Sequence, residues 1–412
     1  MMSLAVLLTL LVAPGPDQVC NFGQESSPYV PASPFNITWT AKHALPKALA
    51  GSACAVINDT IYVIGGRDSA GNRYNSCYMY IPTQDTWIPR ASMPTARAHV
   101  VCGIVRGKIY VIGGWVGSTA SAACEEYDPV ANTWTIKTAM PTPRYTSGAA
   151  THNNLIYVIG GMNMSSQIFG TNEVYNPDSN TWSSRISMPT PRIGGATFLV
   201  GNSIYVAGGS NLSNALTVHE AYDIGADQWQ VKTSLQSRRY CIGACSYQAK
   251  GYAIGGYDYL SYLTTVEVYD PAVNSWSFET PMQNGRQSTA VGLVQNRIYV
   301  IGGWNNGALP YNEEGAIGGI KVADGIAIDR RTVGFSAHPN PACRSFTINM
   351  TGALRNGHFR CAIRDAAGRL VQDLSRSFHD NSGLTVSLPA GVYFVSVQSG
   401  STRRQVKIVV VE

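Results

Sequence analysis

Arginine recurs along this chain at nearly constant spacing, and it is the side chain best suited to hold an anionic group. Its planar guanidinium can donate two parallel hydrogen bonds to one carboxylate. The repeated arginines are 47 or 48 residues apart, at Arg97, Arg144, Arg192, Arg239 and Arg286. A residue that returns in every copy of a repeat can also belong to the scaffold, where it would bind main-chain carbonyls or pair with acids. The sequence alone leaves both interpretations open.

A second group of candidate residues changes from one copy of the repeat to the next. Its members follow Gly-Gly pairs and are aromatic, cationic or sulfur-containing: Arg67, Trp115, Met162, Tyr257, Tyr259 and Trp304. Aromatic rings stack on flat apolar surfaces and attract cations, and Tyr and Trp also keep a polar edge. Together with the repeated arginines, these residues form the predicted ligand-binding set, suited to a glycan or to acidic groups of a protein.

A repeated set of strands must position these residues. Apolar, β-branched runs such as Ile109-Tyr110-Val111-Ile112 end at Gly-Gly, which is typical of strands buried on both faces. The pairs begin at Gly65, Gly113, Gly160, Gly208, Gly255 and Gly302. After each of the first five pairs come a Tyr, a Trp seven residues later, and an Arg ten residues after the Trp. A period of this length indicates a repeat architecture.

The order of strand, Gly-Gly, Tyr, Trp and Met-Pro-x-x-Arg resembles the Kelch repeat over roughly residues 36 to 317. The resemblance implies four-stranded antiparallel blades around a central channel, and the count of Gly-Gly pairs implies six blades. The position 48 residues before Trp87 is Trp39, so we expect an N-terminal strand to complete the last blade and remove its exposed edge. The sixth copy has Ala316 where a Tyr is expected, and its third strand is placed between residues 308 and 322.

The direction of the strands predicts which residues share a face. In a blade of strands a, b, c and d, the b–c and d–a connections lie on one face and the tight a–b and c–d turns on the other. Both candidate sets are therefore expected near one mouth of the channel. The recurring acids Glu125 or Glu126, Glu173, Glu220 and Glu267 precede the third-strand Tyr and are interpreted as structural. Only Glu313 and Glu314, in the irregular last copy, are expected to approach this face.

Catalysis would need a constellation that the sequence does not indicate. His99, His152 and His219 occupy different repeat positions, so they are not expected to form the copper site of galactose-oxidase-like Kelch proteins. The resemblance to exported, six-bladed sialic-acid mutarotases is closer, and it implies a carboxylate with a base or cation at the channel mouth. No Ser/His/Asp or Cys/His set and no C-x-x-C pair is visible. We predict no catalytic residue, no metal and no cofactor.

The C-terminal residues follow a different pattern. Several short strands over about 80 residues predict a small, Ig-like β-sandwich. Pro339-Asn340-Pro341, the Asp365-x-x-Gly368-Arg369 segment and Gly391-Val392-Tyr393 resemble the C-terminal sorting domain of the type IX secretion system. That resemblance implies export across an outer membrane, with the type IX secretion machinery as a partner. A purely structural sandwich, like that of flagellar hook-capping proteins, is the alternative.

The N-terminus and the composition fit export. The apolar run from Leu4 to Val12 is too short to span a bilayer and resembles a signal peptide, although no Lys or Arg precedes it. A buried N-terminal strand is the alternative. The net charge is only +5 and no basic block occurs, so nucleic acid is not an expected partner, and no transmembrane segment is predicted.

The sequence thus predicts an all-β chain with four segments. These are a signal-peptide-like segment at 1–18, a six-bladed Kelch propeller at 34–317 closed by its N-terminal strand, a linker at 318–332 and a sorting or β-sandwich domain at 333–412. The expected function is a secreted or cell-surface module that binds an extracellular glycan or protein through one propeller face. A carbohydrate mutarotase or epimerase is the alternative, and a surface protein without a specific ligand is a third hypothesis.

Overall fold

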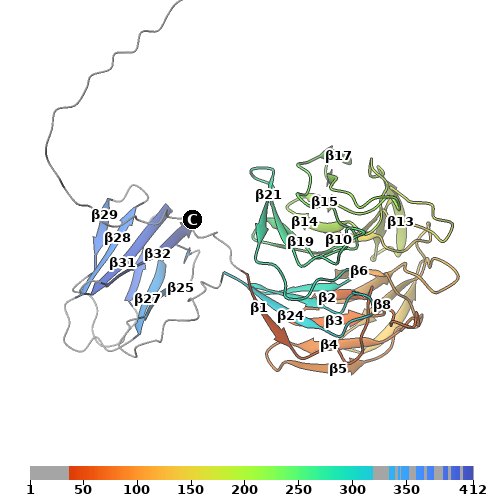
Figure 1. The fold of residues 1–412 in the computed structure, drawn as a ribbon, viewed down its shortest axis with the longest axis horizontal. Coiled ribbons are helices and arrows are strands. Elements are labelled where there is room, and N and C mark those ends of the chain that lie inside the picture. Colours follow the sequence, from red (N-terminus) through yellow and green to blue (C-terminus); the bar gives the residue numbers. More distant parts are fainter. Residues whose placement is uncertain are drawn as a thin grey trace, which may run out of the picture. The chain divides into compact units, whose positions relative to one another are not determined.

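The computed structural model describes residues 37–318, 334–338, 342–343, 345–351, 359–365, 369–374, 384–387, 391–399 and 402–411. These residues form strands and connecting turns (Figure 1). The chain divides into two compact units, Met1–Lys321 and Val322–Glu412. The predicted leader, and the predicted linker apart from its first residue, lie outside the described residues.

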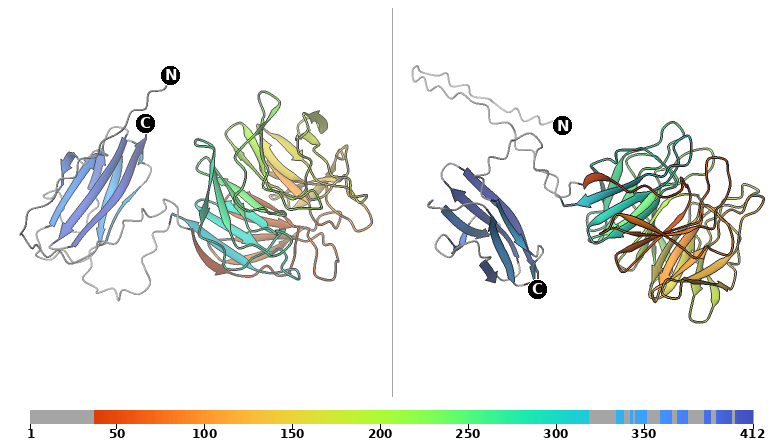
Figure 2. Two further views of the ribbon diagram at one scale, coloured as in Figure 1. Left: turned by 45° about the horizontal axis from the view of Figure 1, so that its top comes forward. Right: turned by 90° about the horizontal axis from the view of Figure 1, so that it is seen from below.

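The first unit is a six-bladed propeller, as predicted. Six separate four-stranded antiparallel sheets surround a channel, and five of them are built from consecutive strands (Figures 1 and 2). In the order a, b, c and d, the strands of blades one to five are β2 (Ala53–Ile57), β3 (Thr60–Ile64), β4 (Cys77–Ile81), β5 (Thr86–Arg90); β6 (Val101–Val105), β7 (Lys108–Ile112), β8 (Cys124–Asp128), β9 (Thr133–Lys137); β10 (Gly148–His152), β11 (Leu155–Ile159), β12 (Asn172–Asn176), β13 (Thr181–Arg185); β14 (Ala196–Val200), β15 (Ser203–Ala207), β16 (His219–Asp223), β17 (Gln228–Val231); β18 (Gly243–Tyr247), β19 (Lys250–Ile254), β20 (Val266–Asp270) and β21 (Ser275–Glu279).

The sixth blade joins the two ends of the propeller. It contains β22 (Ala290–Val294), β23 (Arg297–Ile301), β24 (Asn312–Ile317) and, as its outer strand, β1 (Ile37–Lys42). β1 and β24 lie side by side (Figure 1) and pair antiparallel, with Trp39 opposite Gly315 in the register. The Trp39 Nε1 donates to the carbonyl of Thr280 at 2.9 Å. The closure predicted from the repeat spacing is confirmed, and β24 falls within the window expected for the irregular third strand.

The recurring Tyr and Trp pack inside and between the blades. In the first five blades the ring centroids of each Tyr–Trp pair are 4.7 to 5.3 Å apart. Each Trp also donates its Nε1 to a main-chain carbonyl of the preceding blade, as Trp134 does to Ala91 at 2.8 Å. The Tyr side chains are fully buried, and the contacts of both residue types hold the blades together.

His219 is the first residue of β16 in the fourth blade, and its side chain is fully buried against the fifth blade. Its ring contacts Tyr269 edge-on, with centroids 4.4 Å apart, and its Nε2 has no hydrogen-bond partner. Burial lowers the pKa of His219 to about 4, well below the 6.5 of a free histidine. The folded protein therefore holds this imidazole neutral.

Stability should consequently fall as the pH drops from 6.5 to 4, because in that window the unfolded chain binds a proton that folded His219 does not. The shift corresponds to a loss on the order of 3 kcal/mol by pH 4. His219→Asn, which copies Asn172 and Asn312 at the equivalent position of other blades, should flatten this dependence. Urea denaturation at several pH values measures the free energy of unfolding as a function of pH. An unchanged pH dependence in the variant would contradict its attribution to His219.

The second unit contains two sheets. The three-stranded sheet joins β25 (Gly334–His338), β27 (Ser345–Thr351) and β30 (Leu384–Ser387). The five-stranded sheet has the order β26 (Ala342–Cys343), β32 (Thr402–Val411), β31 (Gly391–Ser399), β28 (Phe359–Asp365) and β29 (Leu370–Asp373). This small all-β unit agrees with the fold class predicted for the C-terminal residues.

Candidate functional site

The b–c and d–a connections form one face of the propeller, which we call the loop face. In every blade, the residue directly after Gly-Gly bridges to a residue of the d–a connection and to a residue further along its own loop. These six equivalent residues are Arg67, Trp115, Met162, Ser210, Tyr257 and Trp304. Gly65 shows why glycine precedes them, because its φ is +69° and an added Cβ would lie 2.6 Å from the carbonyl oxygen of Arg97.

The five repeated arginines belong to the d–a connections, as predicted, but their side chains are buried and do not reach the surface of the loop face, which corrects the exposed position expected for them. Each is buried inside a blade and ion-paired with the recurring acid of the third strand. Arg97 Nη2, for example, is 2.7 Å from Glu125 Oε2 and also donates to the carbonyl of Val111. The other pairs are Arg144–Glu173, Arg192–Glu220, Arg239–Glu267 and Arg286–Glu313.

These arginines are therefore part of the scaffold, as the alternative interpretation of the repeat allowed. The sequence held a signal for the pairing, because an acid follows each arginine by 27 to 29 residues in all five copies. Burial lowers the pKa of Arg97, and the nearby Glu125 carboxylate opposes that shift.

Two further expectations need correction. Glu313 and Glu314 do not approach the loop face: Glu313 pairs with Arg286, and Glu314 accepts from the Tyr299 hydroxyl at 2.6 Å inside the blade. Met162 is only 7% exposed, so it contributes to the base of its loop and not to an open surface.

Three cations on the loop face are backed by aromatic rings. Lys47 Nζ lies 3.9 Å from the ring centroid of Tyr74, the Arg67 guanidinium 4.1 Å from that of Trp304, and the Arg73 guanidinium 4.9 Å from that of Trp115. We call Lys47, Arg67 and Arg73 the aromatic-backed cations. Among the described residues, none of the three forms an ion pair.

Arg67 differs from the other two because its Nε is buried and has no partner within the described structure. Burial lowers the pKa of Arg67, but a guanidinium stays protonated at any physiological pH. The adjacent Asp68 does not pair with it, since that carboxylate accepts from Asn72 and from the Tyr74 hydroxyl at 2.7 Å. These hydrogen bonds lower the pKa of Asp68 to about 2.

A second cluster of aromatic rings belongs to the fifth blade. Tyr240, Tyr257, Tyr259 and Tyr262, which we call the tyrosine cluster, stack in pairs. The centroids of Tyr240 and Tyr259 are 4.8 Å apart, and those of Tyr257 and Tyr262 are 4.6 Å apart. The structure thus brings the predicted residues Tyr257 and Tyr259 together.

The predicted set missed Lys47, Arg73 and Tyr240. Tyr240 directly follows a repeated arginine, at a position occupied by Ala98, Tyr145, Ile193 and Gln287 in other copies. That variation was a usable signal, since varied positions on a regular scaffold are where specificity resides. Lys47 and Arg73 lie in connections whose sequences do not repeat.

At the loop face, the channel is lined by a ring of six residues, one from each d–a connection. All six have positive φ: Gly51, His99, Thr146, Gly194, Cys241 and Ser288. Main-chain hydrogen bonds run from blade to blade around this ring, as from the N–H of His99 to the carbonyl of Gly51 at 2.7 Å. Burial and the charge of Arg67 lower the pKa of His99 to about 4, so its imidazole is neutral at pH 7.

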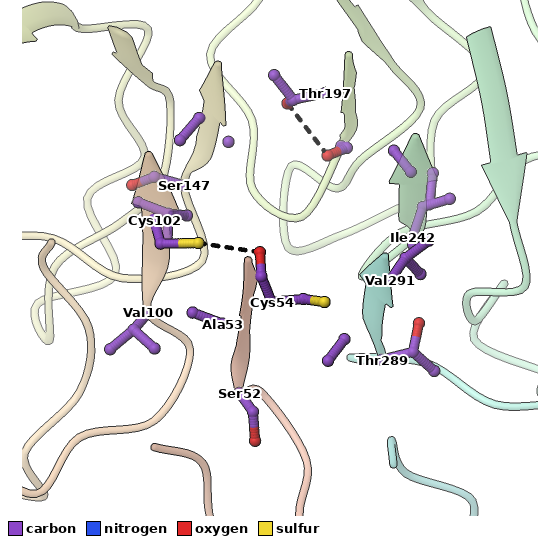
Figure 3. Close-up of a pocket in the computed structure, with 17 residues that line it drawn as sticks. Ser52, Ala53, Cys54, Val100, Cys102, Ser147, Thr197, Ile242, Thr289 and Val291 are labelled. Carbon is purple, nitrogen blue, oxygen red and sulfur yellow. Dashed lines mark hydrogen bonds between the residues drawn. The ribbon is translucent and has the colours of Figure 1, made fainter. Parts of the chain in front are cut away.

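Beyond this ring, strands a line an open pocket of about 170 Å³ (Figure 3). Small hydroxyl, thiol and aliphatic side chains line it, including Ser52, Cys102 and Thr197. Cys102 Sγ donates to the carbonyl of Cys54 at 3.0 Å, and burial raises the pKa of the Cys102 thiol to about 12. The residues that line this pocket include no carboxylate.

The known families that match this chain agree with the observed propeller and C-terminal unit. The KLHDC2/KLHL20/DRC7 Kelch-repeats domain matches residues 36–209, and the Kelch motif matches residues 191–236 and 238–283. Residues 336–412 match the secretion system C-terminal sorting domain. The chain belongs to the Kelch-repeat β-propellers and carries a C-terminal sorting domain.

Among solved structures, one titled "Structure of YjhT" has a TM-score of 0.59 and 16% sequence identity. The match covers 65% of this chain and 95% of that chain, and at this identity it shows the propeller fold alone. No curated protein gives a significant match.

The sorting domain indicates export by the type IX secretion machinery to the cell surface or beyond. The residues that the structure describes include no helix long and apolar enough to cross a membrane. Within the same residues, no group of three or more His, Cys, Asp or Glu side chains is arranged to hold a metal ion.

Proposed function

We propose that this exported propeller is a binding module that recognises an extracellular glycan or protein through its loop face. The observation that carries the proposal is the set of aromatic-backed cations. Buried cations elsewhere in the propeller are paired with carboxylates, as Arg97 is with Glu125. Lys47, Arg67 and Arg73 instead lie against rings, so their charge remains available to an anionic group of a ligand.

The arrangement suits recognition because the cations are already oriented. A guanidinium stacked on an indole loses little side-chain freedom on binding, which reduces the entropic cost of association. A hydrogen bond between charged groups contributes about 1.5–3 kcal/mol in such a setting. The ring of main-chain hydrogen bonds below the loops gives these side chains a rigid base.

The double substitution Arg67→Gln and Arg73→Gln should weaken binding of an anionic ligand about ten-fold or more. The full chain would be applied to a glycan array and used in pull-downs, and the hits would be titrated with both proteins. Arg106→Gln is the matched control, because Arg106 is exposed and lies in an a–b turn on the opposite face. If the double variant, and alanine at Trp115, Tyr257 and Trp304, left all detected binding intact, the assigned face would be wrong.

The alternative activity, a carbohydrate mutarotase or epimerase, makes a different prediction. It requires a carboxylate and a base or cation at the channel mouth, whereas Glu313 and Glu314 are engaged inside the sixth blade. NMR measurement of anomeric exchange separates the two: faster exchange on adding the protein would indicate an enzyme. A surface protein without a ligand would neither bind nor accelerate exchange.

We also infer the organisation of the whole chain from its sequence. A leader at 1–18 would be removed on export, the propeller would occupy 34–317, and a linker at 318–332 would join it to the sorting domain at 333–412. N-terminal sequencing and intact mass of the exported protein test the leader. Attachment to the outer cell surface, as opposed to release, is tested by fractionating the culture.

A further inference from the structure

We propose that the tyrosine cluster of the fifth blade is a stacking site for a neutral carbohydrate ring. The inference rests on the proposed binding role of the loop face and names the ligand class of one part of it. It concerns residues separate from the aromatic-backed cations. Three observations carry it: a fixed aromatic surface, an unusual backbone conformation and a carboxylate beside the ring.

The fixed aromatic surface is Tyr259, which is 38% exposed. Tyr240 stacks against it with an interplanar angle of 28°. The Tyr259 hydroxyl shares a hydrogen bond with Ser210 Oγ at 2.8 Å and donates to the carbonyl of Leu212 at 3.1 Å. Because one face and the hydroxyl are occupied, the exposed ring surface lies away from Tyr240. A rigid ring with an open face is what the C–H groups of a sugar stack upon.

The backbone conformation at this position is the second observation. Four blades have a left-handed residue three positions after the second Gly of the pair, and its identity differs: Gly117, Leu212, Tyr259 and Asn306. Glycine and asparagine adopt this conformation readily, whereas bulky residues do so at a cost. Tyr259 has a φ of 74° and Leu212 a φ of 71°, and both side chains are exposed. Strain of this kind is concentrated at ligand-binding positions.

The carboxylate is Asp258, the neighbour of Tyr259. Its Oδ1 accepts the main-chain N–H groups of Leu260 at 2.8 Å and Ser261 at 2.6 Å, which leaves Oδ2 for a ligand. Burial raises the pKa of Asp258, but these hydrogen bonds outweigh that effect and the pKa is lowered. The carboxyl group is therefore ionised at neutral pH. An ionised carboxylate accepts hydrogen bonds from sugar hydroxyls and repels an acidic sugar. The site therefore favours a neutral sugar.

A protein partner fits this cluster less well. A stable protein interface buries about 800 Å² on each partner. The exposed apolar side chains at the cluster are Leu212, Tyr259 and Leu260, at the tips of two loops. Three side chains are far fewer than the roughly 20–30 residues that each partner contributes to such an interface, whereas a single sugar ring is small enough to rest on them.

The full chain would be tested with cellohexaose, mannohexaose and xylohexaose as neutral probes and with hexagalacturonate as an acidic probe. Isothermal titration would measure affinity, and saturation-transfer NMR would identify the sugar protons in contact. At least one neutral probe should bind through its ring C–H protons. Tyr259→Asn should weaken that binding at least ten-fold, while the melting temperature stays equal or rises because asparagine relieves the backbone.

Tyr311→Ala is the matched control, since Tyr311 is 43% exposed on the loop face of the sixth blade and lies outside the cluster. Its affinity for the neutral probe should be unchanged. Asp258→Asn should narrow the preference for neutral over acidic probes. The inference is overturned if no neutral probe binds, if Tyr259→Asn binds as well as the parent, or if Tyr259 instead proves necessary for capturing a purified protein ligand. Failure of the proposed function would appear separately, in the Arg67 and Arg73 variant with anionic ligands.

Discussion

Replacing Arg239 by methionine should lower the free energy of unfolding by about 3–5 kcal/mol. The substitution leaves the Glu267 carboxylate, whose side chain is 0% exposed, without its ion-pair partner. It also removes the hydrogen bonds that Arg239 donates to the carbonyls of Gly255 and Thr265. A buried, uncompensated charge is among the most destabilising defects a fold can contain.

Urea denaturation followed by tryptophan fluorescence measures this effect. All eight tryptophans lie between Trp39 and Trp304, so the signal reports on the propeller and not on the C-terminal unit. Arg238→Met is the matched control, because Arg238 is the adjacent arginine and is exposed. It should change stability by less than about 0.5 kcal/mol.

A double variant distinguishes loss of the pair from loss of packing. Arg239→Met combined with Glu267→Leu removes both charges, so it should recover part of the stability lost by Arg239→Met alone. Recovery should be incomplete, because Glu267 also accepts the N–H groups of Gln236 and Ser237. A single variant within 1 kcal/mol of the parent would show that the buried pair does not hold the blade.

Trp39→Ala should cost about 3–5 kcal/mol and should also loosen the closure of the ring. Trp39 is 8% exposed, and its indole packs against Gly315 so closely that an added Cβ there would lie 2.8 Å from it. β1 is the one strand that covers the outer edge of β24. Without its anchor, β1 would expose that edge, which is a template for pairing with other chains.

The expected result is a lower urea midpoint together with concentration-dependent oligomers in size-exclusion chromatography. Thr40→Ala is the control, because Thr40 lies next to Trp39 on β1 and is exposed. Gly315→Ala should resemble Trp39→Ala, since the added methyl group collides with Ile37 and Trp39. A monomeric Trp39→Ala protein with unchanged stability would contradict the role given to β1.

The regular parts of the fold were predictable because a periodic sequence repeats its local geometry. The spacing of Gly-Gly, Tyr and Trp predicted six sheets, and counting back from Trp87 predicted that Trp39 would close the ring. Pairing of β1 with β24 follows from a repeat pattern that begins with one extra strand and ends with a blade that is one strand short.

The candidate site was only partly predictable. Trp115, Tyr257, Tyr259, Trp304 and Arg67 were correctly placed on one face, because strand direction alone determines which connections share it. The sequence left open whether the repeated arginines belong to the scaffold or to a ligand site, because spacing gives the position of a Cα along the chain but not the direction of its side chain. Arg97 turns inward since Glu125, 28 residues later, lies beside it in the folded blade.

By itself, the sequence determined the number of blades, the strand that closes them and the face that carries the variable loops. These properties depend on period and strand direction, which are local. The tertiary structure decided which charges are neutralised and which remain available, since that depends on neighbours from different blades. Trp304 of the sixth blade lies under Arg67 of the first, and Ser210 of the fourth blade fixes Tyr259 of the fifth. Contacts of this kind form only when the blades pack side by side, and the contact between Arg67 and Trp304 also requires the ring to be closed.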